Sequence, residues 1–202
     1  MKFSCTGVIL CGGLATRFDG KEKALIRVGG KRILDRIYSV FSEIFGEIIL
    51  VTNKPLQFIE WDLNIVTDLF DIRSSLTGIH AGLFYATNPY AFFAPCDAPF
   101  LKRELVETIL ERIDPKVDIV LPETSAGREP LCAVYSKRCL QTAAQHLEQE
   151  KLKIKLAFQG SRIKTIPENI LRAKDPELIS FFNINGPEDL ERAEKTARKI
   201  DT

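Results

Sequence analysis

The sequence is poor in the residues that build metal clusters and disulfide frameworks. Its 202 residues include two histidines, one methionine, one tryptophan and five cysteines. The number of cysteines is odd and no pair has CxxC spacing, which argues against a disulfide scaffold and against a structural zinc site. A reducing compartment is therefore the expected environment.

Neither sign of charge is in excess. Lysine and arginine number 28, aspartate and glutamate number 27, and the formal net charge is +1. Because nucleic acids and anionic membranes are bound by clustered positive charge, we expect neither as a partner. Any anion must be bound at a local site.

Long hydrophobic runs are also lacking. The N-terminal stretch "MKFSCTGVILCGG" has a short apolar run that ends at Gly12 and Gly13. Such a run is shorter than a signal-peptide core with its cleavage site, and far below the roughly 20 residues of a membrane span. We expect a cytoplasmic protein.

What the sequence does contain is an alternation of short apolar runs and helical patterns. Apolar residues recur at helical spacing near residues 33–45 and 101–113, and Pro187 opens a third helical segment. This alternation predicts an α/β fold with a mainly parallel sheet covered on both faces, in a single domain spanning 1–202. The runs of strand length are Thr6–Cys11, Glu47–Val51, Asn64–Thr67, Ala91–Ala94, Val117–Leu121, Leu131–Tyr135 and Phe181–Ile184.

The loop after the first expected strand, "CGGLATRFDGKEKAL", combines glycine with positive charge. Gly12 and Gly13 allow close approach of backbone amides to a ligand, and Arg17, Lys21 and Lys23 have few nearby carboxylates to pair with. The loop matches neither the Walker A pattern nor GxGxxG. It is either a phosphate-binding loop of another type or a solvated basic turn.

The fourth strand is followed by "APCDAPF", in which Asp97 lies between Pro95 and Pro99. The prolines stiffen the turn and hold the carboxylate in place. A fixed carboxylate near a phosphate loop favours a magnesium ligand, because Mg²⁺ is often held by one or two carboxylates and by substrate phosphates. The alternative is a cap for the helix that begins near Leu101.

Polar residues follow other strands as well. Asn53 follows "IILV" and suits either a contact to a base or sugar or a plain turn, and Asp68 lies at the sheet edge or pairs with Arg73. Asn183 and Asn185 are one strand period apart, so a strand would point both to the same face.

The remaining polar candidates give weaker signals. Arg128 and Glu129 suggest an exposed hairpin pair. His80 and His146 have no partner at ligand spacing, which favours structural roles, and Cys96 is assigned to packing because no partner histidine is evident.

Several motifs together resemble a known family. "LCGGLATRFDGKEKAL" is similar to the LAGGxxxRMGxDK signature of the molybdenum cofactor guanylyltransferases, the MobA-like nucleotidyltransferases. "PCDAPFL", "REPLCAVY" and "NINGPEDL" resemble later motifs of that family in the same order. The usual GPLAG is replaced by "SSLTG" at residues 74–78.

The resemblance implies a Rossmann-like three-layer sandwich of the nucleotide-diphospho-sugar transferase type. Its N-terminal half, about 1–100, would bind the nucleotide, and its C-terminal half, about 101–202, would bind the acceptor. Arg17, Lys23 and Asp97 would be catalytic, with Asp97 as the Mg²⁺ ligand. The implied nucleotide contacts are Leu10, Cys11, Gly12, Gly13, Lys23, Asn53, Asp68 and Asp97, and the implied acceptor contacts are Arg128, Asn183 and Asn185.

The same resemblance implies transfer of GMP from GTP to the terminal phosphate of molybdopterin, with release of pyrophosphate. Transient contacts with other cofactor-biosynthesis proteins or apo-molybdoenzymes would follow. CTP as donor, a sugar or polyol phosphate as acceptor, or a non-catalytic guanine-nucleotide-binding module remain as alternatives.

Overall fold

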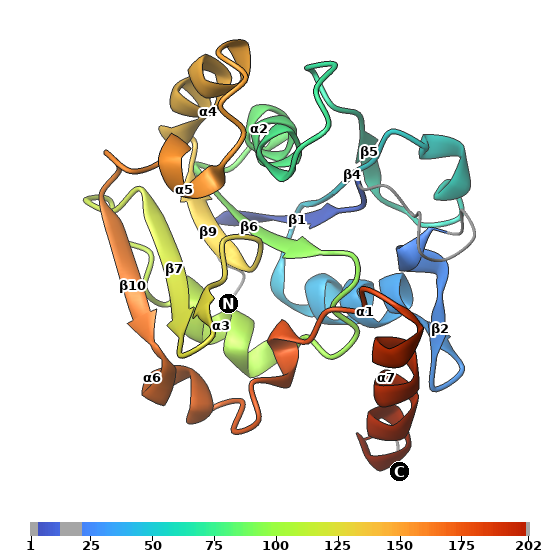
Figure 1. The fold of residues 1–202 in the computed structure, drawn as a ribbon. Coiled ribbons are helices and arrows are strands. Elements are labelled where there is room, and N and C mark those ends of the chain that lie inside the picture. The colour runs from blue at the N-terminus through green and yellow to red at the C-terminus, as the bar shows by residue number, and fades with distance from the viewer. Residues whose placement is uncertain (1–3, 13–21, 201–202) are drawn as a thin grey trace.

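A computed structural model describes residues 4–12 and 22–200 of the chain, and Gly13, Arg17 and Lys21 lie outside these residues. Figure 1 shows the arrangement of its helices and strands. The strands are β1 Cys5–Leu10, β2 Arg27–Val28, β3 Lys31–Arg32, β4 Ile48–Val51, β5 Asn64–Val66, β6 Tyr90–Pro95, β7 Ile119–Thr124, β8 Gly127–Arg128, β9 Ala133–Ser136 and β10 Ile163–Pro167. The helices are η1 Lys23–Leu25, α1 Ile33–Ile44, η2 Pro55–Gln57, α2 Ser75–Tyr85, α3 Arg103–Leu110, α4 Cys139–Glu148, α5 Ile154–Ala157, α6 Glu168–Arg172, η3 Ile179–Phe181 and α7 Pro187–Ile200, with η marking 3₁₀ turns.

One large sheet runs through both halves of the sequence. Its strand order is β10-β7-β9-β6-β1-β4-β5, and β8 pairs with β7. Within that order only β9 runs antiparallel to its neighbours, while β10, β7, β6, β1, β4 and β5 are parallel to one another. The carboxyl ends of all the parallel strands therefore lie at one edge, where α/β folds bind their ligands.

Helices cover both faces of this sheet, with α2 and α4 on one face and α1 and α3 on the other (Figure 1). Side chains of β1 alternate between the two cores: Ile9 packs with the α1 and α3 residues, and Val8 packs with the α2 and α4 residues. A strand buried on both faces reads as a continuous apolar run, which is why β1 was visible in the sequence. The predicted α/β sandwich with a mainly parallel sheet is confirmed.

Two glycines bring helices unusually close to the strands that carry the site. A Cβ atom at Gly7 would lie 2.6 Å from Phe45 Cδ2, and one at Gly82 would lie 2.6 Å from Phe93 Cε1 and 2.7 Å from Val8 Cγ1. Because real side chains do not approach this closely, neither position accepts a larger residue without movement. Tight packing on both faces thus fixes the position of β1.

The structure contradicts one predicted strand and adds four that the apolar pattern did not reveal, namely β2, β3, β8 and β10. Residues 181–184 do not join the sheet: η3 ends at Phe181, and the Ile184 amide donates instead to the Asp97 carbonyl. The longest of the added strands is β10, which lies at the end of the sheet and buries only Ile166 fully. Edge strands carry polar residues, so "IKTIP" lacked the apolar run that marked the inner strands.

No helix among the described residues is both long and apolar enough to cross a membrane.

Candidate active site

The end of β1 carries three of the predicted nucleotide contacts. Leu10 and Cys11 are buried, and the Cys11 amide donates to the Val51 carbonyl at 2.8 Å. Among the residues that the structure describes, no atom lies within 4 Å of a Cβ placed at Gly12, so the backbone there borders open space on the side of those residues. This space lies at the sheet edge, just before the residues that the structure does not describe.

Lys23, Asp97 and Asn185 meet beside that space, although they come from segments far apart in the sequence. Lys23 Nζ lies 2.9 Å from Asp97 Oδ2 and 3.1 Å from Asn185 Oδ1. The side chains of Lys23 and Asp97 are 23% and 18% exposed, so both are partly shielded yet open to solvent. The cluster combines an ammonium, a carboxylate and an amide, a set suited to binding a phosphate together with its counter-ion.

This geometry corrects one sequence expectation and excludes one alternative. Lys23 does have a carboxylate partner, because parallel strands bring the Asp97 loop to the same edge as the β1 loop. Asp97 is not a helix cap: α3 begins at Arg103, and its capping position is Lys102. The helix-cap interpretation of Asp97 is therefore wrong for this structure.

Asn53 and Asp68 lie together after β4 and β5. Asn53 Nδ2 donates to Asp68 Oδ2 at 2.7 Å, and the Asp68 amide donates to Asn53 Oδ1 at 3.3 Å. Partial burial raises the pKa of Asp68 above its ordinary value. The two residues therefore form one paired polar group at the sheet edge, next to β1 on its β4 and β5 side.

Asn183 and Asn185 do not share a strand face as the sequence predicted. Because residues 181–184 are not a strand, the period of two does not apply, and the two side chains have different surroundings. Asn183 Oδ1 is buried with no hydrogen-bond partner among the described residues, whereas Asn185 is exposed and reaches Lys23. Only Asn185 joins the Lys23–Asp97 cluster.

A buried network holds the Asn183 segment against the Asp97 loop. Asp175 is fully buried, its carboxylate accepts from the Ser180 amide at 2.8 Å, and it pairs with Lys102 Nζ at 2.8 Å. The Lys102 amide in turn donates to Ser180 Oγ at 3.0 Å. Burial alone would raise the pKa of Asp175, but the Lys102 ammonium and the Ser180 amide outweigh it and lower the pKa. Nothing in the sequence around "AKDPE" indicated this role.

Arg128 lies apart from the asparagines, on the short strand β8. Its Nε lies 2.9 Å from Glu123 Oε1, so its partner is Glu123 and not the neighbouring Glu129. Arg128 lines a largely apolar cavity of about 490 Å³ together with Tyr135, Phe158 and others. The expected exposed Arg128–Glu129 pair is therefore wrong, and the predicted acceptor residues fall in two different places.

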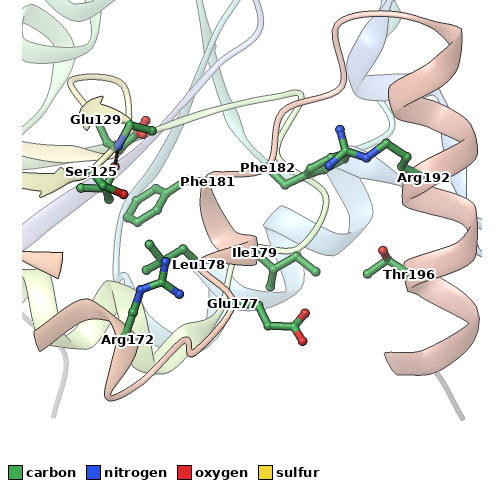
Figure 2. Close-up of a pocket in the computed structure, with 12 residues that line it drawn as sticks. Ser125, Glu129, Arg172, Glu177, Leu178, Ile179, Phe181, Phe182, Arg192 and Thr196 are labelled. Atoms are coloured by element: carbon green, nitrogen blue, oxygen red, sulfur yellow. Dashed lines mark hydrogen bonds between the residues drawn. The ribbon is translucent and has the colours of Figure 1, made fainter. Parts of the chain in front are cut away.

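A second cavity of about 410 Å³ opens between the β7–β8 hairpin, η3 and α7 (Figure 2). Glu129 and Phe181 are among its lining residues, and the sequence assigned neither of them to a ligand site. Phe181 was hidden by the strand interpretation of residues 181–184, and Glu129 by the hairpin-pair interpretation. A lone Glu or Phe in a loop carries no spacing signal that would have found them.

The two histidines and Cys96 fit the structural roles expected for them. Cys96 is partly buried and packs against the core that contains α1 and α3. His80 is buried, its ring lies 4.9 Å from the Phe70 ring, and burial lowers its pKa. His146 Nδ1 lies 3.0 Å from the Thr142 carbonyl within α4. Burial raises the pKa of the Cys11 thiol well above its ordinary value. Within residues 4–12 and 22–200, no three His, Cys, Asp or Glu side chains cluster as a metal site.

Comparison with known proteins gives one consistent result. A family model described as "MobA-like NTP transferase domain" matches residues 7–163. A protein of Desulfosudis oleivorans named molybdenum cofactor guanylyltransferase is 46% identical, over 94% of this chain and 94% of its own length. A probable molybdenum cofactor guanylyltransferase of Natranaerobius thermophilus is 36% identical over 100% of both chains. The crystal structure of molybdopterin-guanine dinucleotide biosynthesis protein A from Archaeoglobus fulgidus has a TM-score of 0.85 and 29% identity, and the match covers 96% of this chain and 99% of that one.

Proposed function

The chain belongs to the MobA-like NTP transferase family, and from that premise we propose that it is a guanylyltransferase that transfers GMP from GTP to the terminal phosphate of molybdopterin. Pyrophosphate is the second product, and the reaction belongs to molybdenum cofactor biosynthesis. The observation that carries the proposal is the convergence of Lys23, Asp97 and Asn185 at the carboxyl edge of the sheet. The choice of guanine and of molybdopterin rests on the names of the similar proteins.

The proposed nucleotide site extends from this cluster along the first half of the chain. Gly12 borders open space, and the paired Asn53 and Asp68 lie at the ends of β4 and β5. With the base or ribose bound at Asn53 and Asp68, the phosphates of the nucleotide would lie near Lys23. Leu10 and Cys11 support the backbone beneath. Gly13 and Arg17, assigned to the same site by resemblance, lie outside the described residues.

The donor set fits a magnesium ion. Asp97 offers a hard carboxylate at the sheet edge, 18% exposed, in a stiff turn beside the proposed phosphate position. Mg²⁺ is commonly held by one or two carboxylates and by substrate phosphates. When bound, such an ion would neutralise charge on the reacting phosphate, and Asp97 would be the residue of this chain that holds it.

The chemical step needs positioning more than proton transfer. An oxygen of the acceptor phosphate attacks the α-phosphorus of GTP, the new P–O bond forms, and the bond to the β-phosphate oxygen breaks with pyrophosphate leaving. A phosphate monoester has its second pKa near 6, so its oxygen is anionic near neutral pH and no protein base is needed. When the nucleotide binds, the Lys23 ammonium contacts its phosphates in place of Asp97. Asn185 lies on the side of the acceptor.

We further propose a single domain in which residues of about 1–100 bind the nucleotide and residues of about 101–202 bind the acceptor. Arg128 and Asn183 belong to the acceptor half in this scheme. The protein acts in the cytoplasm, and its labile product passes by transient contact to other cofactor-biosynthesis proteins or to apo-molybdoenzymes.

The test is a nucleotide panel followed by a transfer assay. Calorimetry with GTP, CTP, ATP and UTP in the presence of Mg²⁺ is expected to show selective binding of GTP, weakened in Asp97→Ala. Pyrophosphate release should then require both GTP and molybdopterin. Preference for CTP would indicate a cytidylyltransferase, and binding without pyrophosphate release would indicate a non-catalytic module.

A further inference from the structure

The cavity between the β7–β8 hairpin, η3 and α7 is linked to the proposed reaction site by the short segment 182–185. Its η3 wall leads into Asn183, whose neighbour Ile184 donates to the Asp97 carbonyl at 2.9 Å. Asn185, two residues beyond Asn183, reaches Lys23. Only residues 182–184 therefore separate Phe181 in the cavity wall from Asn185 at the Lys23–Asp97 cluster.

Glu129 gives this cavity an unpaired acceptor. Its side chain is half-buried, and the structure gives its carboxylate no ion pair or hydrogen bond among the described residues. Burial raises its pKa above the ordinary value. A half-buried carboxylate without protein donors is incompletely satisfied, and a ligand that brings N–H groups would supply the missing hydrogen bonds.

Phe181 gives the cavity a partly buried aromatic ring. Phe182 is occupied on the α7 side by the Arg192 guanidinium, 5.1 Å from its ring centroid, and packs against Phe100 at 6.2 Å. Phe181 has no such ring partner within the described part of the chain, and Figure 2 shows its ring on the side of the hairpin residues Ser125 and Glu129. A planar ring is the ligand shape that such an aromatic ring stacks on.

The backbone next to Phe181 is strained as well. Leu178 lines the same cavity and has a φ of 52°, in the left-handed region that a branched residue seldom adopts. Residues held in this region cost free energy and cluster at ligand sites. The strain is held by Asp175, because the Ser180 amide that follows Leu178 donates to its carboxylate.

Resting on the proposed function, we infer that this cavity binds the ring system of the acceptor, a planar nitrogen heterocycle with a 2-amino-4-oxo edge. Glu129 accepts hydrogen bonds from the ring N–H and the exocyclic amino group, and Phe181 stacks on the ring. A carboxylate matches this edge because it offers acceptors only, and the edge offers adjacent donors.

Guanine has the same donor edge, and the strand order separates the two rings. The proposed nucleotide contacts Asn53 and Asp68 follow β4 and β5, whereas the cavity lies beyond β7 and β8. At about 4.8 Å per strand step, β4 and β7 are roughly 19 Å apart. The guanine base and the acceptor ring therefore extend in opposite directions from phosphates that meet between β1 and β6.

The experiment uses 6-hydroxymethylpterin as the probe, followed by its own fluorescence, with the intact protein and three variants. Glu129→Gln keeps the size of the side chain but replaces one acceptor by a donor, and Phe181→Leu keeps an apolar side chain without a flat face. Glu177→Gln is the matched control, because Glu177 lines the same cavity from an exposed position. GTP binding is measured in parallel by calorimetry.

We expect pterin affinity to fall roughly 10-fold to 100-fold in Glu129→Gln, the range for a hydrogen bond to a charged group. A fall of roughly 10-fold is expected in Phe181→Leu from lost stacking. Both variants should bind GTP as the wild type does, and Glu177→Gln should bind both ligands as the wild type does.

Four results would overturn the inference. These are no pterin binding to the wild type, unchanged affinity in Glu129→Gln, equal losses in Glu129→Gln and Glu177→Gln, and loss of GTP binding instead of pterin binding. The last result would make the cavity the guanine site. Pterin binding is measured without turnover, so the test of the cavity does not depend on the transfer reaction. If the wild type binds pterin through Glu129 but transfers no GMP, the proposed function is wrong and the pterin site remains supported.

Discussion

Two Lys–Asp pairs of nearly equal length serve different parts of the molecule. Lys23 and Asp97 lie 2.9 Å apart at the open edge of the sheet, and Lys102 and Asp175 lie 2.8 Å apart beneath the segment that carries η3. Asp97 is 18% exposed, whereas Asp175 is fully buried and also accepts from the Ser180 amide. Distance alone does not separate them.

The two pairs differ in whether a ligand can replace one member of the ion pair. A phosphate group can reach Lys23 from solvent, so its ion pair is replaceable at little cost, as partly exposed pairs are. No ligand can reach Asp175, and removal of its carboxylate would leave the Ser180 amide buried without an acceptor. We therefore expect the first pair to control turnover and the second to control stability and the shape of the acceptor side.

The largest expected effect is on turnover at the first pair. Lys23→Ala and Asp97→Ala should each lower the rate of GMP transfer roughly 100-fold to 1,000-fold, or about 2.7 to 4 kcal/mol of barrier, because each removes a positioned charge. Pyrophosphate release under saturating GTP measures the effect. Thermal unfolding midpoints should remain close to that of the wild type.

Wild-type rates in both variants would remove this pair from the mechanism. In the double variant Lys23→Ala/Asp97→Ala, the increase in activation free energy should be smaller than the sum of the two single increases, because residues that act on the same phosphate are not independent. A fully additive increase would also contradict the scheme.

A smaller effect is expected at the second pair, and on a different quantity. Asp175→Ala should lower the free energy of unfolding by about 2 kcal/mol, because a buried hydrogen-bonded carboxylate is lost while Lys102, 36% exposed, regains water. Urea denaturation measures this change. With Leu178 no longer held, KM for the acceptor should rise more than kcat falls.

Each pair serves as the control for the other. Asp97→Ala and Asp175→Ala remove the same group from pairs of the same length, so unfolding and turnover can be compared directly. If Asp175→Ala unfolds like the wild type but loses as much kcat as Lys23→Ala, the two pairs do not have the separate roles proposed for them.

The smallest expected effect concerns pH. The pKa of Asp175 is lowered in the folded protein, so its charge contributes stability that is fully present above its ordinary value, near 3.8, and is lost as pH falls from there through the folded pKa. Asp175→Asn keeps an acceptor for Ser180 but no charge, and should cost about 1 kcal/mol at neutral pH. Urea denaturation at pH 7 and at pH 3.5 should show this difference shrinking with acid. A difference that is constant or grows with acid would contradict the assignment.

The sequence predicted those parts of the fold that depend on local pattern. Inner strands such as β1 and β6 are apolar on both faces and are visible as runs, and the rule that ligands bind at the carboxyl edge brought Lys23 and Asp97 together in expectation. The edge strand β10 was missed because only Ile166 is fully buried.

The acceptor side was predicted less well because its geometry depends on distant contacts. Residues 181–184 are as apolar as a strand, yet Asp175 and the left-handed Leu178 turn them into a 3₁₀ turn and a loop. A period of two has no meaning outside a strand, so Asn183 and Asn185 did not share a face. Glu129 gave no signal because its lack of a partner becomes visible only when its neighbours are placed.

The Lys23–Asp97 pair also bears on which anions the protein takes up from a mixed solution. An ammonium that already has a carboxylate beside it is a poor trap for free sulfate or inorganic phosphate, since such an ion would displace Asp97 and leave that charge uncompensated. A nucleoside triphosphate that travels with its own divalent cation offers a counter-charge to both members of the pair at once. Under the proposed function, we therefore expect this ion pair to favour metal-loaded nucleotides over free anions, before any base is recognised.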